Sequence, residues 1–175
     1  MCKIIFVTGG ICSGKSDFAE NIAKQHDSIT YIALSEKRDE DKNWQNKINK
    51  HKSKRPENWK LIESDDLLKV LTKVEDNLLI DSIGGFVVKL INENDDEWRR
   101  NLDILIQIFL SYKHYVIIVG EQVGWGLVSE YQIGNRFAER MGQVLKEITN
   151  IATENWLTIN GKAIRLDEIF TSKHI

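Results

Sequence analysis

The chain has 175 residues, 42% of them hydrophobic, a length that predicts one domain over residues 1–175. Its net charge of −2 at pH 7 argues against a nucleic-acid-binding protein with a strongly basic face. No apolar run approaches the ~20 residues of a membrane span, and no signal-peptide pattern opens the chain. The two cysteines suggest neither a metal cluster nor a disulfide framework. We therefore expect a cytoplasmic protein.

Short apolar strands alternate with helical periods along the chain. Strands are predicted at residues 3–8, 29–34, 60–63, 77–81 and 115–120, and helices at 16–25, 39–50, 67–74, 98–110 and 137–152. In the last helix the apolar spacings of 4, 3, 1, 3 and 4 fit a period of 3.6. A closing hairpin is predicted from residues 155–159 and 163–166 around Asn160-Gly161. Continuous apolar strands between helices predict an α/β fold with a largely parallel sheet and helices on both faces.

The first predicted strand leads directly into a phosphate-binding pattern. The P-loop pattern G-x-x-x-x-G-K-[ST] is met by residues 9–16, which we call the P-loop: Gly9, Gly10, Ile11, Cys12, Ser13, Gly14, Lys15 and Ser16. Glycines let successive backbone N–H groups turn toward a phosphate, and the helix that follows adds its positive N-terminal end. Lys15 would reach the terminal phosphates, and the Ser16 hydroxyl would coordinate Mg²⁺. The alternative, a chance glycine-rich turn, does not explain why a strand precedes the pattern and a helix follows it.

Asp81 ends a predicted strand that is otherwise apolar. In a P-loop nucleotide site, an acid at the end of a neighbouring apolar strand holds Mg²⁺ directly or through water. Ser16 and Asp81 are therefore the predicted Mg²⁺ residues. The alternative is an aspartate that only caps the end of its strand.

Residues 36–60 carry nine Lys or Arg against five Asp or Glu, a local charge of +4. This charge suits a polyphosphate, although by composition alone a solvated helix face is the simpler interpretation. His51 lies in the middle of this segment, with Lys50, Lys52, Lys54 and Arg55 close by in sequence. Neighbouring cations disfavour the imidazolium, which leaves a neutral nitrogen able to attack phosphorus. A surface histidine in a basic turn is the alternative.

Five segments, in order over almost the whole chain, together resemble one known family. They are Phe6 to Glu20 with the P-loop, Tyr31-Ile32-Ala33, the pattern Lys47-Ile48…His51-Lys52…Arg55-Pro56…Trp59…Glu63, Leu79-Ile80-Asp81, and Val123 to Val128. The chain's only proline falls inside the histidine pattern. The family is that of the bifunctional adenosylcobinamide kinase / adenosylcobinamide-phosphate guanylyltransferases of cobalamin synthesis.

The resemblance implies a RecA-like P-loop sheet assembled as a homotrimer. It also implies two reactions, in which ATP or GTP phosphorylates the adenosylcobinamide side chain and GMP then passes from GTP to the corrinoid phosphate. His51 would attack the α-phosphate of GTP, forming a GMP-histidine intermediate and releasing pyrophosphate. By the same resemblance, further nucleotide contacts would come from Ala33, Leu34, Ser35, Lys52, Ser53, Lys54, Arg55, Glu63 and Asp81. Glu63 could accept hydrogen bonds from the donor edge of guanine.

Several positions depart from the family's common pattern, most of them in the second half of the chain. They are Cys12, Leu34, Gly84, Lys89, Glu121, Gln122, Ala138 and Leu145. The residues for nucleotide binding and guanylyl transfer are kept, so we expect a divergent but working enzyme. Two alternatives stay open: a small-molecule P-loop kinase in which His51 is inert, and a nucleotide-binding regulatory subunit without catalysis.

Overall fold

The computed structural model describes residues 3–34, 56, 58–126 and 128–169, and its strands form one seven-stranded sheet. The strands are β1 (Ile4–Gly9), β2 (Thr30–Leu34), β3 (Lys60–Ser64), β4 (Leu78–Asp81), β5 (Val116–Glu121), β6 (Glu154–Ile159) and β7 (Lys162–Arg165). Their order across the sheet is β3-β2-β4-β5-β1-β6-β7. Every neighbouring pair is parallel except β6 and β7. The prediction of a largely parallel sheet with a closing hairpin is confirmed.

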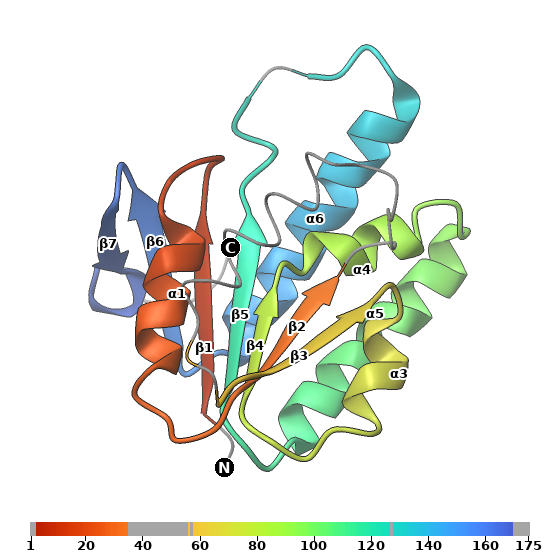
Figure 1. Ribbon diagram of the computed structural model, residues 1–175. Coiled ribbons are helices and arrows are strands. Elements are labelled where there is room, and N and C mark those ends of the chain that lie inside the picture. The colour runs from red at the N-terminus through yellow and green to blue at the C-terminus, as the bar shows by residue number, and fades with distance from the viewer. Residues whose placement is uncertain (1–2, 35–55, 57, 127, 170–175) are drawn as a thin grey trace, which may run out of the picture.

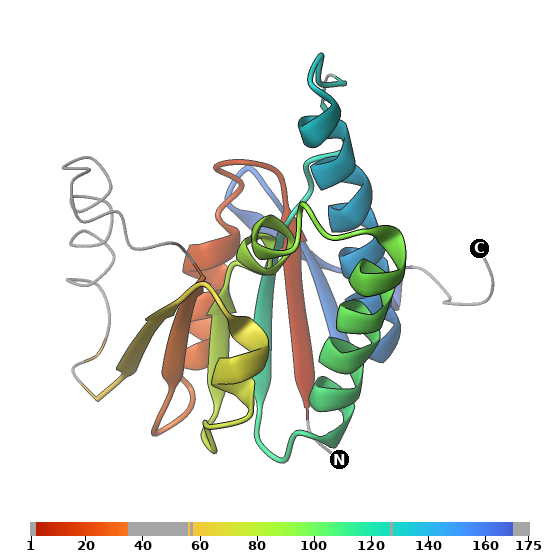
Figure 2. The same cartoon turned by 90° about the vertical axis from the view of Figure 1, so that its right-hand side faces the viewer.

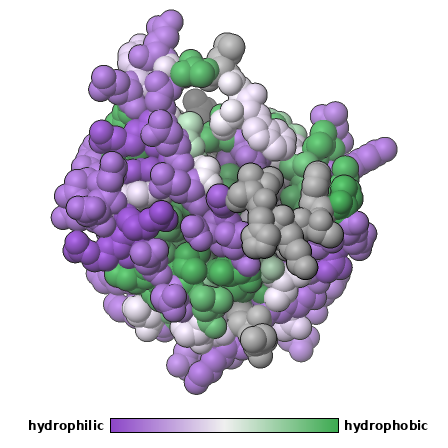
Figure 3. Space-filling model, turned by 180° about the vertical axis from the view of Figure 1, so that it is seen from behind, coloured by the Kyte–Doolittle hydropathy of each residue, from purple (hydrophilic) through white to green (hydrophobic). Residues whose placement is uncertain are grey.

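Helices cover both faces of this sheet, as the sequence predicts. They are α1 (Lys15–Ala23), α3 (Leu67–Leu71), α4 (Gly84–Lys89), α5 (Asp95–Ser111) and α6 (Gln132–Ile151), with a 3₁₀ turn η1 (Leu166–Glu168). Figures 1 and 2 show α1 against one face and α3, α4, α5 and α6 against the other. Seen from behind, the surface is mostly hydrophilic, with smaller hydrophobic groups between (Figure 3). Within the described ranges, no helix has the length and apolar character needed to cross a membrane.

Strand alternation divides the core into two parts. On the α1 side, the buried strand residues are Ile5, Val7, Tyr31, Leu79, Ile117 and Val119. On the other side, the neighbouring strand residues Ile4, Phe6, Ile32, Leu78, Ile80, Val116 and Ile118 pack with the larger group of helices. Side chains alternate along a strand, so every second residue faces the same side of the sheet. Asp81 follows Leu79 in this way on β4, and Glu121 follows Val119 on β5. Both carboxylates therefore face the side on which α1 lies.

The helices differ from the predictions mainly in four places, of which the first is α3, which ends at Leu71 and not at residue 74. Helix α4 was not predicted, because a short segment that opens with Gly84 and Gly85 has low helix propensity and too few turns to show a period. Helix α5 begins before residue 98, because the Asn94 side chain accepts a hydrogen bond from the Glu97 backbone N–H at 2.9 Å and so caps it. Helix α6 begins before Phe137, at Gln132, and the apolar residue of its first turn, Ile133, is exposed. The helix predicted at 39–50 lies outside the described residues.

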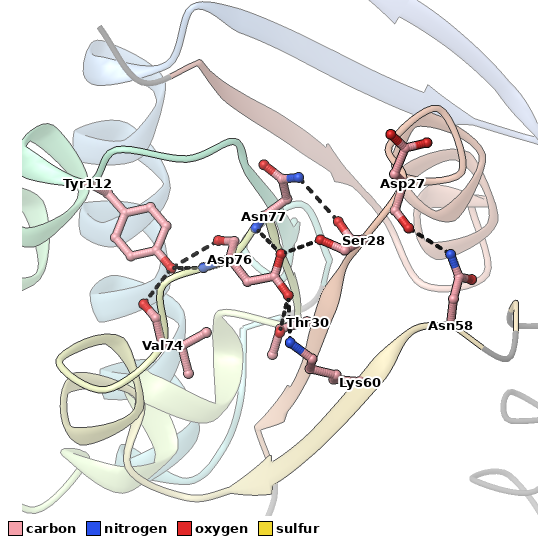
Figure 4. A network of polar contacts seen from close by, with 9 residues as sticks. All are labelled: Asp27, Ser28, Thr30, Asn58, Lys60, Val74, Asp76, Asn77 and Tyr112. Atoms are coloured by element: carbon pink, nitrogen blue, oxygen red, sulfur yellow. Dashed lines mark hydrogen bonds and ion pairs between the residues drawn. The ribbon is translucent and has the colours of Figure 1, made fainter.

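Asp76, in the loop before β4, contacts residues at the start of β2, β3 and β4, at the end of the sheet opposite the P-loop (Figure 4). Its carboxylate accepts hydrogen bonds from the hydroxyls of Ser28 at 2.6 Å and Thr30 at 3.1 Å, and from the backbone N–H of Asn77 at 2.8 Å. The Lys60 ammonium lies 3.4 Å away. Burial acts to raise the pKa of Asp76, but these hydrogen bonds outweigh it and hold the pKa below its ordinary value.

Candidate functional site

The P-loop turns at the carboxyl end of β1 and leads into α1 (Figure 1). Two of its residues have left-handed backbone conformations, Cys12 with φ 57° and Gly14 with φ 93°. The Lys15 ammonium donates to the backbone oxygen of Gly10 at 3.2 Å, which holds the charge across the loop. Ser16 lies in the first turn of α1, beside the unpaired N–H groups of the helix start. This geometry suits a bound phosphate.

The hairpin of β6 and β7 supports the P-loop from the side, which the sequence did not predict. The buried Thr158 hydroxyl lies 2.8 Å from the Ser13 hydroxyl and donates to the backbone oxygen of Thr8 at 3.2 Å. The backbone N–H of Gly161 donates to the Ser13 carbonyl at 2.9 Å. A Cβ on Gly9 would lie 2.4 Å from the Thr158 hydroxyl, so this approach requires glycine.

Asp81 ends β4, two strands away from the P-loop strand. The Tyr31 hydroxyl donates to Asp81 Oδ2 at 2.7 Å, which fixes the orientation of the carboxylate. A carboxylate can accept several hydrogen bonds, so the contact with Tyr31 leaves capacity for a cation or its water. Among the described residues, no group of three or more His, Cys, Asp or Glu could hold a metal. Mg²⁺ at a nucleotide site takes one or two carboxylates together with phosphate oxygens, so the donors present fit it.

The remaining predicted nucleotide contacts fall partly inside the described residues. Ala33 and Glu63 are paired in register on β2 and β3, and the Glu63 side chain is exposed. The Leu34 side chain packs in the core on the other face, against Gly85, where an added Cβ would lie 2.4 Å from the Leu34 Cβ. A nucleotide could therefore meet Leu34 through its backbone. Outside the described residues lie Ser35, His51, Lys52, Ser53, Lys54 and Arg55.

Glu121 ends β5, between the P-loop strand and the Asp81 strand. The Ser82 hydroxyl donates to its Oε1. Its Oε2 is shielded from solvent and has no hydrogen-bond partner within the described part of the chain. The next residue, Gln122, turns the other way and donates from Nε2 to the Thr8 hydroxyl at 3.1 Å. A strand-end acid was visible in the sequence, but its direction depends on the sheet.

A cavity of about 500 Å³ lies between the loop that follows β5 and the start of α6. Val123, Gly124, Phe137 and Ala138 are among the residues that line it. Ala138 is one of the positions that depart from the family's pattern. This departure therefore lies outside the phosphate-binding loop.

Comparison with known proteins identifies relatives of this chain in sequence and in fold. A family model described as cobinamide kinase / cobinamide phosphate guanyltransferase matches residues 5–166. The chain is 30% identical to the "bifunctional adenosylcobalamin biosynthesis protein CobU" of Salmonella typhimurium and 26% identical to the Escherichia coli protein of that name, in each case over 93% of this chain and 99% of the relative. A solved structure from Pyrococcus horikoshii shares the fold, with a TM-score of 0.53, 7% identity, and coverage of 93% of this chain and 85% of that one. Because the family model spans most of its length, the chain belongs to the cobinamide kinase / cobinamide phosphate guanyltransferase family.

Proposed function

We propose that this chain phosphorylates the hydroxyl of adenosylcobinamide and then transfers GMP from GTP to the phosphate so formed. Family membership over residues 5–166 supports both reactions. The observation that carries the proposal is the convergence of the P-loop and Asp81 at one edge of the sheet, on the face covered by α1. On the resemblance alone, we further propose a cytoplasmic homotrimer, with ATP, GTP and the corrinoid as substrates and no nucleic-acid partner.

In the kinase reaction, residues 9–16 would bind the nucleotide phosphates. Backbone N–H groups and the start of α1 supply partial positive charge, and the Lys15 ammonium, which lies across the loop, supplies a full one. Ser16 and Asp81 would hold Mg²⁺, which when bound neutralises phosphate charge. Tyr31 would keep the Asp81 carboxylate turned toward this site. The reaction then depends mainly on positioning and charge stabilisation.

In the transferase reaction, a His51 nitrogen would form a bond to the α-phosphorus of GTP as the bond to the pyrophosphate oxygen breaks. The cations from Lys52 to Arg55 would stabilise the departing pyrophosphate. An oxygen of the corrinoid phosphate would then attack the same phosphorus and release His51. Glu63, exposed on the edge strand beside Ala33, would bind the guanine edge.

A labelling experiment tests the transferase half directly. The protein is incubated with Mg²⁺ and GTP labelled at the α-phosphate, then run on a denaturing gel beside His51→Ala, Lys15→Met and the control His114→Ala, which alters an exposed histidine. We expect acid-labile label on the unaltered protein and the control, and none on His51→Ala. GTP binding without label would contradict guanylyl transfer and leave a P-loop kinase. Absence of corrinoid phosphorylation as well would leave only the regulatory subunit.

A further inference from the structure

We propose that Glu121 is the catalytic residue that accepts the proton of the substrate hydroxyl during phosphorylation. This inference rests on the kinase half of the proposed function. Transfer of a phosphoryl group to an alcohol releases a proton, and a positioned carboxylate can accept it. Glu121 combines the right place in the sheet with an oxygen that no described group occupies.

The place follows from the order and register of the strands. Strand β5 lies between β1, which carries the P-loop, and β4, which carries Asp81. Glu121 pairs in register with Gly9 at the start of the P-loop, and Val119 pairs with Asp81. Ile117 and Val119 are both buried on the α1 side. Glu121 continues this alternation, so its side chain lies on the same face of the sheet as the P-loop and Asp81.

The two carboxylate oxygens of Glu121 have different surroundings. Oε1 accepts the hydrogen bond from Ser82, which fixes the side chain. Oε2 is shielded from solvent and has no hydrogen-bond partner among the described residues. A Cβ on Gly84 would lie 3.1 Å from Oε2, so any larger residue at position 84 would crowd this oxygen. A buried oxygen without a partner reduces stability, and a functional role explains why it is present.

The other polar side chains at this edge are committed elsewhere. Asp81 accepts a hydrogen bond from Tyr31 and is the proposed Mg²⁺ residue. Gln122 has no acidic group and donates to Thr8 on the opposite side of the strand. Within the described part of this edge, Glu121 is therefore the carboxylate best placed to accept a proton.

The hydroxyl oxygen of the cobinamide side chain forms a bond to the γ-phosphorus of the bound nucleotide, while the bond from that phosphorus to the β,γ-bridging oxygen breaks. The hydroxyl proton passes to Oε2 of Glu121. The nucleoside diphosphate leaves with the bridging oxygen, and the Glu121 proton is later lost to water.

The test compares Glu121→Gln with the unaltered protein and with the control Glu168→Gln, a substitution at an exposed position in η1. Three quantities are measured on each: cobinamide phosphorylation in a single turnover, nucleotide affinity, and GMP labelling of the protein from GTP. Glutamine preserves the acceptor for Ser82 but cannot take up a proton at Oε2. We expect phosphorylation to slow by about 100-fold or more, with nucleotide affinity and GMP labelling changed by less than threefold.

Thermal unfolding separates this role from a structural one. Because Oε2 lacks a partner among the described residues, Glu121→Gln should be at least as stable as the unaltered protein. Phosphorylation within threefold of the unaltered rate would overturn the proposal, as would equal losses of phosphorylation, labelling and stability. An unaltered protein that forms the GMP adduct but phosphorylates no corrinoid would also overturn it, while leaving the transferase half of the proposed function intact.

Discussion

Arg140 on α6 offers a sharp test of how the helical layer is held together. Its side chain is 3% exposed and donates to the backbone oxygens of Leu90 at 2.6 Å, Ile91 at 3.1 Å and Glu93 at 2.7 Å. Its guanidinium also lies 4.9 Å from the centre of the Trp98 ring. The residue therefore joins α6 to the connection between α4 and α5, and we predict that Arg140→Ala strongly destabilises the fold.

The expected magnitude follows from these contacts. A hydrogen bond to a charged group contributes about 1.5–3 kcal/mol, but three bonds on one guanidinium do not add fully, so we expect a loss of about 3–5 kcal/mol. The salt bridge from Arg140 to Asp95 adds little, because the Asp95 side chain is fully exposed. For a chain of this size, such a loss lowers the melting temperature by roughly 6–20 °C.

Urea denaturation followed by circular dichroism measures this loss in the free energy of unfolding. Arg140→Met separates packing from hydrogen bonding, since it keeps an apolar stem but leaves the three carbonyls without their donor. Arg99→Ala, at a position with a 61% exposed side chain, is the matched control and should cost less than about 0.5 kcal/mol. An Arg140→Met variant as stable as the unaltered protein would show that the three carbonyl contacts do not stabilise the fold.

Three further predictions concern the loop support and the opposite edge of the sheet. Thr158→Val should weaken GTP binding about tenfold, measured by calorimetry, because the buried Ser13 hydroxyl loses its partner. Thr158→Ser keeps the hydroxyl and should bind GTP normally. Unchanged affinity in the valine variant would contradict the role of Thr158 in supporting the P-loop. Gly9→Ala should lower the melting temperature, because its Cβ would lie 2.4 Å from the Thr158 hydroxyl, whereas Gly10→Ala meets nothing within 4 Å and should leave it unchanged. Asp76→Ala should cost about 1–3 kcal/mol at pH 7. The folded pKa of Asp76 lies below its ordinary value of 3.8, so this stabilisation is present above that value and is lost as the pH falls through the folded pKa. The difference in free energy of unfolding between the unaltered protein and Asp76→Ala should therefore be smaller near pH 3 than at pH 7, as measured by denaturation at both pH values.

The sequence predicts the P-loop well because its information is local. Gly14, Lys15 and Ser16 act together as neighbours in the chain, and the apolar strand before them is visible as a continuous run. Asp81 is predicted for the same reason, because it is the polar residue that ends an apolar strand. Thr158 was not found, because its contact with Ser13 spans 145 positions and depends on β6 pairing with β1.

The sequence pattern also does not show which face of the sheet a side chain at the end of a strand lies on. Glu121 and Gln122 are adjacent and both polar, yet one faces Ser82 and the other Thr8. Only the register of β5 between its two neighbours decides which of them lies on the P-loop side. Helix α4 shows a similar limit, since its burial through Phe86 and Val87 stabilises a segment whose own propensity is poor.

The proposed residues for the two reactions come from different parts of the chain, which makes the reactions separable. Lys15, Asp81 and Glu121 belong to the loop and strand ends at one edge of the sheet, whereas His51 lies in the sequence between β2 and β3. We therefore predict that His51→Ala abolishes GMP labelling but retains cobinamide phosphorylation, that Glu121→Gln does the reverse, and that Lys15→Met impairs both because both reactions use the bound triphosphate. Parallel assays of the two products on the three variants test this pattern. If His51→Ala also stopped phosphorylation, the kinase reaction would depend on His51 as well, and the two reactions would not be separable.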